Sequence, residues 1–251
     1  MLIVNNLQVR FGAFTAVDNV SLSVAQGELL GLAGTNGAGK STLFAAVAGQ
    51  TPIASGSVEF CGTVLTHQPA HRRAASGLAR TFQVPREFGA LTVLENLLAA
   101  APNEANETLP AAWLFRRRAA RRDAYWTQQA EAVLNQLKLA HVRDLPAAGL
   151  SGGQKKLLEL ARILIRKPQM ILLDEPFAGV NPVLIGALMQ VLRQLHEDGI
   201  TLVVVEHHLQ ALKALCSRMV VMDQGRILAD GTPDAVLGSP AVQAAYMGGA
   251  A

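Results

Sequence analysis

The alternation of apolar and polar residues changes along the chain, and each change predicts a different element. Residues 2–9 and 20–24 alternate in part, which predicts two half-buried strands with a turn at residues 10–13 between them. Residues 29–33 form an unbroken apolar run, which predicts a buried strand. Residues 41–48 follow a glycine-rich loop and predict the first turns of a helix.

Shorter elements are expected after this helix. Residues 58–60 and 63–65 flank a Cys-Gly turn, which predicts a short hairpin. Residues 69–76 predict a short helix, and residues 78–82 predict a short strand that ends at Gln83.

Between residues 84 and 150 the β-branched runs disappear, which predicts a helical insert in the chain. Residues 91–98 have helical spacing and begin with a capping box. Residues 102–110 contain two prolines and predict a loop, and residues 113–139 predict a long helix. The apolar face of that helix consists of Ala130, Val133, Leu134 and Leu137.

Strands that alternate with helices return after residue 169. Short apolar runs predict strands at residues 170–173, 200–205, 219–222 and 227–229. Helical spacing predicts helices at residues 183–197, 208–216 and 233–237. This alternation favours a mostly parallel sheet covered by helices, so the predicted fold class is α/β.

Composition limits the class of protein. The 251 residues, half of them hydrophobic, suffice for one large domain or a domain with a subdomain. No apolar run has the length that a bilayer span requires, and the N-terminus lacks the pattern of a signal peptide. The two cysteines form no CxxC pair, which favours a reducing, cytoplasmic setting.

The charges do not indicate a nucleic acid partner. The net charge of +3 is weak support for a polyanion. An arginine cluster at residues 116–122 fits a solvated face or a docking surface for another chain or for lipid headgroups. The aromatic residues beside it fall on predicted helix, which favours packing over base stacking.

Residues 34–41 read G-x-x-x-x-G-K-S, the pattern of a phosphate-binding loop, which is called the phosphate loop below. The loop follows a predicted strand and precedes a predicted helix, as the pattern requires. Its glycines let backbone N–H groups point into one concavity, and the helix N-terminus adds partial positive charge. Lys40 can reach the β- and γ-phosphates of a nucleotide, and the Ser41 hydroxyl can coordinate Mg²⁺.

Two acidic residues follow the apolar strand predicted at 170–173. Asp174 emerges at the carboxyl end of that strand, where ligands bind in open α/β sheets, so we expect it to hold Mg²⁺. Glu175 comes next, in position to orient and deprotonate an attacking water.

A second anion-binding candidate lies at the end of the helical insert. Ser151, Gly152, Gly153 and Gln154 precede a helix predicted from Lys155 to Ile165. Backbone N–H groups at such a helix start suit an anion, although Ser-Gly-Gly is also common as a plain N-cap turn.

Taken in order, these motifs resemble ABC ATPase cassettes over essentially the whole chain. The resemblance implies that Phe11 stacks on adenine, that Gln83 touches Mg²⁺ or the lytic water, and that His207 contacts the γ-phosphate. It implies phosphate contacts from Gly34, Thr35, Asn36, Gly37, Ala38, Gly39, Lys40, Ser41 and Thr42. It also implies that the segment from Ser151 to Gln154 faces the ATP of a second cassette, identical or different. Asn181 of this chain occupies a position where many members of the family have an aspartate.

The same resemblance implies an architecture of one ABC ATPase domain. Residues 1–83 and 165–251, approximately, would form a RecA-like P-loop core with an N-terminal antiparallel β subdomain. Residues 84–164, approximately, would form an inserted helical subdomain that includes the signature motif L-S-G-G-Q at residues 150–154.

Local features narrow the kind of cassette. The segments at 80–83, 91–97 and 157–162 and the ending from Gly231 to Gly248 resemble the branched-chain amino acid importer group. This resemblance implies permease subunits that dock at residues 83–98, a solute-binding protein, and a peripheral location at the cytoplasmic face of the cell membrane. A lipopolysaccharide-export ATPase is the nearest alternative. A soluble ABC protein of translation or repair fits less well, because those proteins usually carry two cassettes or a long coiled-coil insertion.

Overall fold

The computed structural model of the chain describes residues 1–81, 87–102 and 116–248. Its contacts divide the chain into two compact units. Unit 1 comprises Met1–Gln83, Pro168–Ala178 and Ile185–Ala251, and unit 2 comprises Val84–Lys167 and Gly179–Leu184. Among the described residues, no helix combines the length and the hydropathy that crossing a membrane requires.

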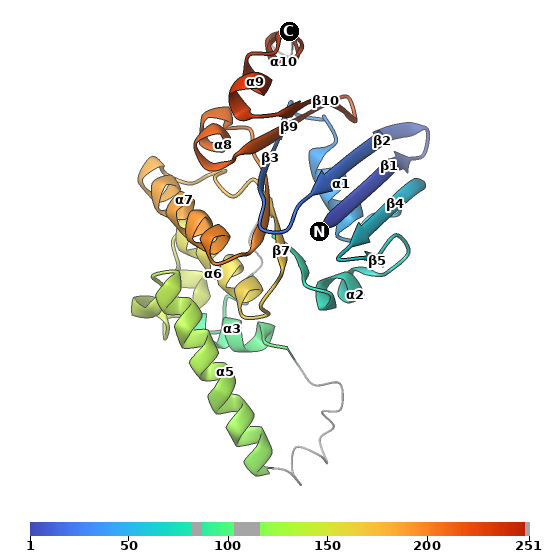
Figure 1. The fold of residues 1–251 in the computed structure, drawn as a ribbon. Coiled ribbons are helices and arrows are strands. Elements are labelled where there is room, and N and C mark those ends of the chain that lie inside the picture. The colour runs from blue at the N-terminus through green and yellow to red at the C-terminus, as the bar shows by residue number, and fades with distance from the viewer. Residues whose placement is uncertain (82–86, 103–115, 249–251) are drawn as a thin grey trace. The chain divides into compact units, whose positions relative to one another are not determined.

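A six-stranded sheet with the order β10-β9-β3-β8-β7-β6 forms the centre of unit 1 (Figure 1). Its strands are β3 (Leu29–Gly34), β6 (Leu78–Arg80), β7 (Met170–Asp174), β8 (Thr201–Val205), β9 (Arg218–Asp223) and β10 (Arg226–Gly231). All neighbouring strands are parallel except β10, which runs antiparallel to β9. Every residue of β3, β7 and β8 is buried, as expected for a parallel sheet covered on both faces. The predicted mostly parallel α/β sheet is therefore confirmed.

A second, antiparallel sheet with the order β2-β1-β4-β5 is formed by the N-terminal part of unit 1. Its strands are β1 (Leu2–Phe11), β2 (Phe14–Val24), β4 (Ser55–Phe60) and β5 (Thr63–Val64). The hairpin around Cys61 is confirmed. The turn predicted at 10–13 is shorter in the structure, because β1 continues to Phe11 and β2 begins at Phe14. The second strand, predicted at 20–24, is correspondingly longer. Bulges shift the register between β1 and β2, and Asn19 has a φ of 54°, so the alternation breaks where the pairing continues.

The helices of unit 1 are α1 (Lys40–Val47), α2 (Ala70–Ala75), most of α7 (Pro182–Glu197), α8 (Leu209–Leu215), α9 (Pro233–Leu237) and α10 (Pro240–Gly248). The last of these was not predicted, and the strand expected at 78–82 ends at Arg80.

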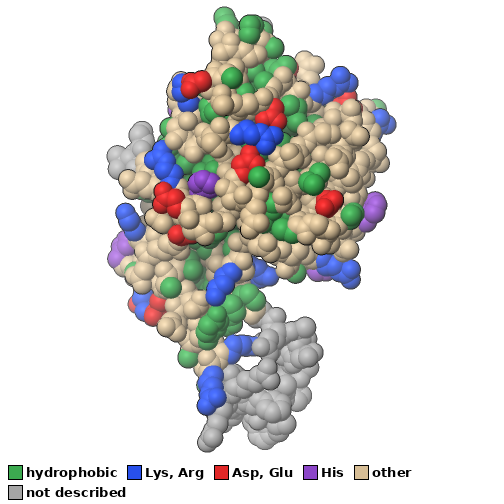
Figure 2. All heavy atoms as spheres, viewed as in Figure 1, with side chains coloured by type: hydrophobic (Ala, Val, Ile, Leu, Met, Phe, Trp, Pro, Cys, Tyr) green, Lys and Arg blue, Asp and Glu red, His purple; other side chains and the backbone are tan. Residues whose placement is uncertain are grey.

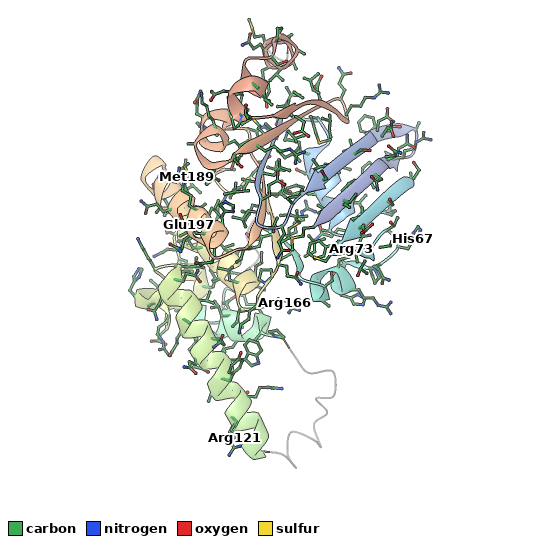
Figure 3. All side chains as sticks on the ribbon, viewed as in Figure 1. His67, Arg73, Arg121, Arg166, Met189 and Glu197 are labelled. Carbon is green, nitrogen blue, oxygen red and sulfur yellow. The ribbon has the colours of Figure 1, made fainter. Side chains whose placement is uncertain are left out.

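The buried Arg73 of α2, labelled in Figure 3, caps the C-terminus of α1. Its guanidinium donates to the carbonyls of Ala46 and Val47 at 2.8 Å and to those of Thr66 and Gln68 at 2.9 Å.

Unit 2 is helical and contains α3 (Val93–Ala100), α5 (Arg116–Gln136), α6 (Gly152–Leu164) and short 3-10 turns at Ala140–Val142 and Ala147–Gly149. The capping box of α3 is confirmed, because Thr92 Oγ1 accepts from Glu95 N and Glu95 Oε2 accepts from Thr92 N. The long helix ends at Gln136, before the predicted 139, because Lys138 adopts a left-handed φ of 57°.

The apolar face predicted for the long helix is largely buried: Ala130, Leu134 and Leu137 are inaccessible, and Val133 is half-buried. The predicted loop at 102–110 lies outside the described residues except for its first residue. In the arginine cluster, Arg121 is exposed (Figure 3). Figure 2 shows Lys and Arg side chains scattered over the visible face, some of them beside Asp or Glu side chains.

Candidate active site

The phosphate loop connects the central strand β3 to α1, and its backbone explains its glycines. Gly34 and Gly39 have φ values of 149° and 94°, in the range that favours glycine. A Cβ atom at Gly34 would lie 2.2 Å from the carbonyl oxygen of Met222, and one at Gly39 would lie 2.3 Å from that of Ala16. Both positions therefore exclude larger residues, so that the loop can pass close to β9 and β2.

Lys40 is the first residue of α1, and its side chain folds back over the loop. The residue is only 5% exposed, and Nζ donates to the carbonyl oxygens of Gly34 and Thr35, both at 2.8 Å. Burial lowers the pKa of Lys40, while the nearby charges of Glu175 and Asp174 act in the opposite direction. The loop thus holds an ammonium group at its mouth, where an anion can bind.

The register of the parallel strands brings the acidic residues to the same edge of the sheet. Val205 at the end of β8 pairs with Leu32 of β3 on one side and with Asp174 of β7 on the other. Glu175 N donates to the carbonyl oxygen of Val205 at 3.0 Å, and Glu206 N donates to that of Leu32 at 3.2 Å. The residues that follow these strands consequently lie beside the phosphate loop.

Asp174 is buried and contacts the predicted metal ligand of the phosphate loop. Its Oδ1 accepts a hydrogen bond from Ser41 Oγ at 3.2 Å. A hydroxyl and a carboxylate are the hard oxygen ligands that suit Mg²⁺, which usually completes its shell with water and substrate phosphates. Among the described residues, no three His, Cys, Asp or Glu side chains gather into an all-protein metal site. The pair therefore fits a magnesium ion that arrives with a nucleotide.

Glu175 and His207 form a direct pair across the ends of β7 and β8. Glu175 Oε1 lies 2.8 Å from His207 Nε2. Glu175 has a φ of 50°, a left-handed conformation that is strained for this residue and that concentrates at functional sites. The contact with Glu175 is made by His207 and not by His208, the residue just before α8, so the geometry favours His207 as the residue that belongs to the site.

Glu206 is a site residue that was not predicted from the sequence. It is 4% exposed, and its carboxylate accepts from Phe177 N at 2.7 Å and from His207 N at 3.2 Å. Burial raises the pKa of Glu206, while the backbone N–H groups lower it in part. Glu206 thus ties the segment after Glu175 to His207. The signal in the sequence was a charged residue at the end of a wholly apolar strand.

A cavity of about 300 Å³ opens over these groups. Its lining consists of Phe11, Phe14, Ala16, Asn36, Gly37, Ala38, Gly39, Lys40, Ser41, Thr42, Glu175 and His207. The structure therefore brings together most of the phosphate loop, the predicted base and the predicted histidine. Phe11 and Phe14 remain 54% and 65% exposed at its edge. Phe14 and Ala16 were not predicted, because sequence reasoning assigned them to no element.

The predicted Ser-Gly-Gly segment lies in unit 2, and Gln83 lies outside the described residues. Ser151 caps α6: its Oγ accepts from Gln154 N at 3.4 Å, and Gln154 Oε1 accepts from Ser151 N at 2.9 Å. Ser151 and Gly152 are exposed, whereas Gly153 is covered by the side chain of Leu184. The exposed start of the helix can receive an anion, but the side chain of Gln154 is used within the cap.

Asn181, which replaces a common aspartate, caps α7 through its side chain. Its Oδ1 accepts from Leu184 N at 2.9 Å. An aspartate carboxylate could make the same bond, so the substitution keeps the cap and removes a negative charge.

The fold and the cavity define a phosphate-loop nucleotide-binding protein of the α/β class. Residues 17–178 match the family described as ABC transporter, and residues 226–251 match the family described as branched-chain amino acid ATP-binding cassette transporter. The chain belongs to the ABC transporter family and is an ATP-binding cassette, an ATPase coupled to transport. The family expected from the motifs, that of the ABC ATPase cassettes, is therefore confirmed.

Curated relatives match over nearly the full length of the chain. The probable branched-chain amino acid transport ATP-binding protein LivG of Archaeoglobus fulgidus is 34% identical and covers 97% of this chain and 93% of its own. BraF of Pseudomonas aeruginosa, a high-affinity branched-chain amino acid transport ATP-binding protein, is 34% identical, with coverages of 99% and 98%. The lipopolysaccharide export ATP-binding protein LptB of Escherichia coli K12 is 32% identical, with coverages of 98% and 97%.

Solved structures confirm the cassette fold. A nucleotide-free ATP-binding cassette from an ABC transporter aligns with a TM-score of 0.86 at 34% identity over 98% of both chains. The ADP conformation of the cassette MJ1267 aligns with a TM-score of 0.84 at 33% identity, over 99% of this chain and 98% of that chain.

The close approach at Gly39 gives a test of the site. In a Gly39→Ala variant, the new Cβ would meet the carbonyl oxygen of Ala16, so the loop must shift, and we expect ATP affinity to fall at least about tenfold in a calorimetric titration. Gly62→Ala is the matched control, because Gly62 also has a positive φ of 76° but has no atom near its Cβ position. Equal ATP affinity in the two variants would contradict the steric argument.

Proposed function

We propose that this chain is the ATP-hydrolysing subunit of an importer for branched-chain amino acids or related small polar solutes. The observation that carries the ATPase role is the cavity that gathers the phosphate loop, Glu175 and His207. The solute class is supported by the match at residues 226–251 and by the names of LivG and BraF. Lipopolysaccharide export is the alternative, supported by LptB at a similar identity.

In the proposed reaction, Glu175 orients and deprotonates the water that attacks the γ-phosphate. Its left-handed backbone and its contact with His207 hold the carboxylate at the cavity. Lys40 and His207 stabilise the negative charge on the transferred phosphoryl group, and Phe11 stacks on adenine. Ser41 and Asp174, with Gln83, would hold Mg²⁺, which when bound offsets phosphate charge. Backbone N–H groups of the phosphate loop bind the phosphates.

The proposed role of Glu175 is tested by Glu175→Gln. The variant keeps the size of the side chain but removes the base, so we expect ATP to bind with nearly unchanged affinity while turnover falls by about 10²-fold or more, measured as phosphate release. We also expect ATP to hold this variant as a dimer in size-exclusion chromatography. Glu197→Gln, at the exposed end of α7, is the control (Figure 3). Normal turnover in Glu175→Gln would remove Glu175 as the base.

We further propose that the nucleotide site is completed by a second cassette, identical or different. Ser151 and Gly152 present exposed backbone N–H groups at the start of α6, and the helix dipole favours an anion there. In this arrangement each ATP lies between the phosphate loop of one chain and the Ser-Gly-Gly segment of the other. The chain then acts as one ATPase domain whose core binds ATP and whose helical part receives the partner's ATP.

Ser151→Arg tests the contribution of this segment. The larger, charged side chain should block the second cassette, so we expect ATP binding by the single chain to persist and turnover to be lost. Because Ser151 also caps a helix, the control is Thr232→Arg, which removes a cap of the same 3.4 Å geometry from α9. A parallel loss of about 1 kcal/mol in stability is expected for both variants. Loss of ATP binding in Ser151→Arg alone would contradict the proposal.

The permease is proposed to dock on the segment at residues 83–98. In its described part, Phe88 is 50% exposed, and its ring lies 4.8 Å below the guanidinium carbon of Arg162. The buried Asn96 accepts from Phe88 N at 2.9 Å and donates to the carbonyl oxygen of Phe88 at 3.0 Å. This support keeps an exposed aromatic residue in a fixed position, as a docking anchor requires. A solute-binding protein would act through the permease, and the cassette would lie at the cytoplasmic face of the membrane.

The solute class is tested by uptake in cells. Cells that lack this chain should lose most uptake of radiolabelled leucine, isoleucine and valine, and the native gene should restore it. A gene encoding Glu175→Gln should not restore it, because ATP turnover drives transport, whereas Glu197→Gln should. Normal uptake together with a defect in lipopolysaccharide export would favour the alternative.

A further inference from the structure

Arg80, the last residue of β6, binds the same carboxylate that is proposed to hold the metal. Its Nη2 lies 2.8 Å from Asp174 Oδ2, and the two side chains are only 11% and 3% exposed. Nη1 donates to Gln50 Oε1 at 2.5 Å, and Nη2 lies 3.4 Å from the carbonyl oxygen of Ser41. The guanidinium therefore bridges β7 and the region of α1, beside the phosphate loop.

The two oxygens of Asp174 have different partners. Oδ1 contacts Ser41 Oγ, the proposed metal ligand, whereas Oδ2 contacts Arg80. We infer that Arg80 is the counter-cation of Asp174 before nucleotide binds, and that a divalent cation must compete with it. Arg80 is thus a positioning residue that sets the metal affinity of the site. This inference rests on the proposed metal-binding role of Asp174.

The competition follows from electrostatics in a partly dehydrated site. A buried carboxylate without a counter-charge is unfavourable, and the guanidinium supplies that charge. The same positive charge repels a divalent cation that approaches Oδ1, and the repulsion is stronger than in bulk water because both charged side chains are largely buried. Arg80 Nε is itself buried and has no hydrogen-bond partner among the described residues, so the position is not favourable for the guanidinium alone.

Removing the guanidinium should leave the strand in place. Arg80 pairs with Leu172 in the parallel ladder, and Thr81 N donates to the carbonyl oxygen of Leu172 at 2.9 Å. Thr81 Oγ1 also accepts from Asp174 N at 3.0 Å. These contacts fix the backbone of Asp174 without Arg80, so a variant at Arg80 reports on charge at the carboxylate.

The test measures Mn²⁺ binding by electron paramagnetic resonance in the Glu175→Gln protein with saturating ATP. Adding Arg80→Gln should lower the Kd for Mn²⁺ roughly tenfold, because the competing charge is gone. Without metal, the same variant should melt at a lower temperature, and Mn²⁺ should restore more stability to it than to the parent. Arg72→Gln is the control, since Arg72 is exposed on α2 and the hydrogen bond of its guanidinium goes to Gln68, away from Asp174.

Gln50→Leu gives a second measurement if Arg80→Gln does not fold. It removes the acceptor of Nη1, so the guanidinium is displaced more easily, and Mn²⁺ should bind a few-fold more tightly. Unchanged or weaker Mn²⁺ binding in these variants would overturn the inference. Failure of the proposed function looks different: the parent protein would bind Mn²⁺ no more tightly than ATP alone does, or Asp174→Asn would leave Mn²⁺ binding unchanged.

Discussion

The register of three parallel strands is the constraint on which the rest of the site depends. Because Val205 stands between Leu32 and Asp174, the residues that follow β3, β8 and β7 reach one edge of the sheet together. The backbone pairing of buried strands thus fixes where Lys40, Glu175 and His207 lie relative to one another. A shift of β8 by a single residue would turn its side chains to the other face and separate His207 from Glu175. Packing on both faces of these strands opposes such a shift, so the apolar core helps to hold the candidate site together.

Charge is arranged around this edge in compensating groups. Lys40 lies over the loop carbonyls, Arg80 lies on Asp174, and Glu206 accepts backbone N–H groups. Each group would be unfavourable alone at its degree of burial, and the neighbours make the set tolerable. The lowered pKa of Lys40 and the raised pKa of Glu206 both come from burial. An anion that binds to Lys40 would therefore compete with the loop carbonyls that its ammonium group already contacts.

Much of this could be predicted from the sequence, because the informative patterns are local. The phosphate loop and the acidic end of β7 each lie in one continuous segment, and unbroken apolar runs identify the buried strands. Partners that are distant in sequence could not be predicted this way. The Arg80–Asp174 bond and the contact of Glu206 with Phe177 depend on which strands are neighbours. The early part of β2 was missed because its bulges break the period, although Ala16 and Val17 are buried there.

The hydrogen bonds of Arg73 fix the C-terminal end of α1. The N-terminus of this helix opens onto the phosphate loop, and its C-terminal carbonyls are fixed by a buried guanidinium that also holds Thr66 and Gln68. The cation complements the negative end of the helix dipole, as an anion would complement the positive end. Because the C-terminal carbonyls of α1 are fixed, an anion that binds at the N-terminus meets a helix that is already hydrogen-bonded to α2, and through Arg73 to the segment after β5.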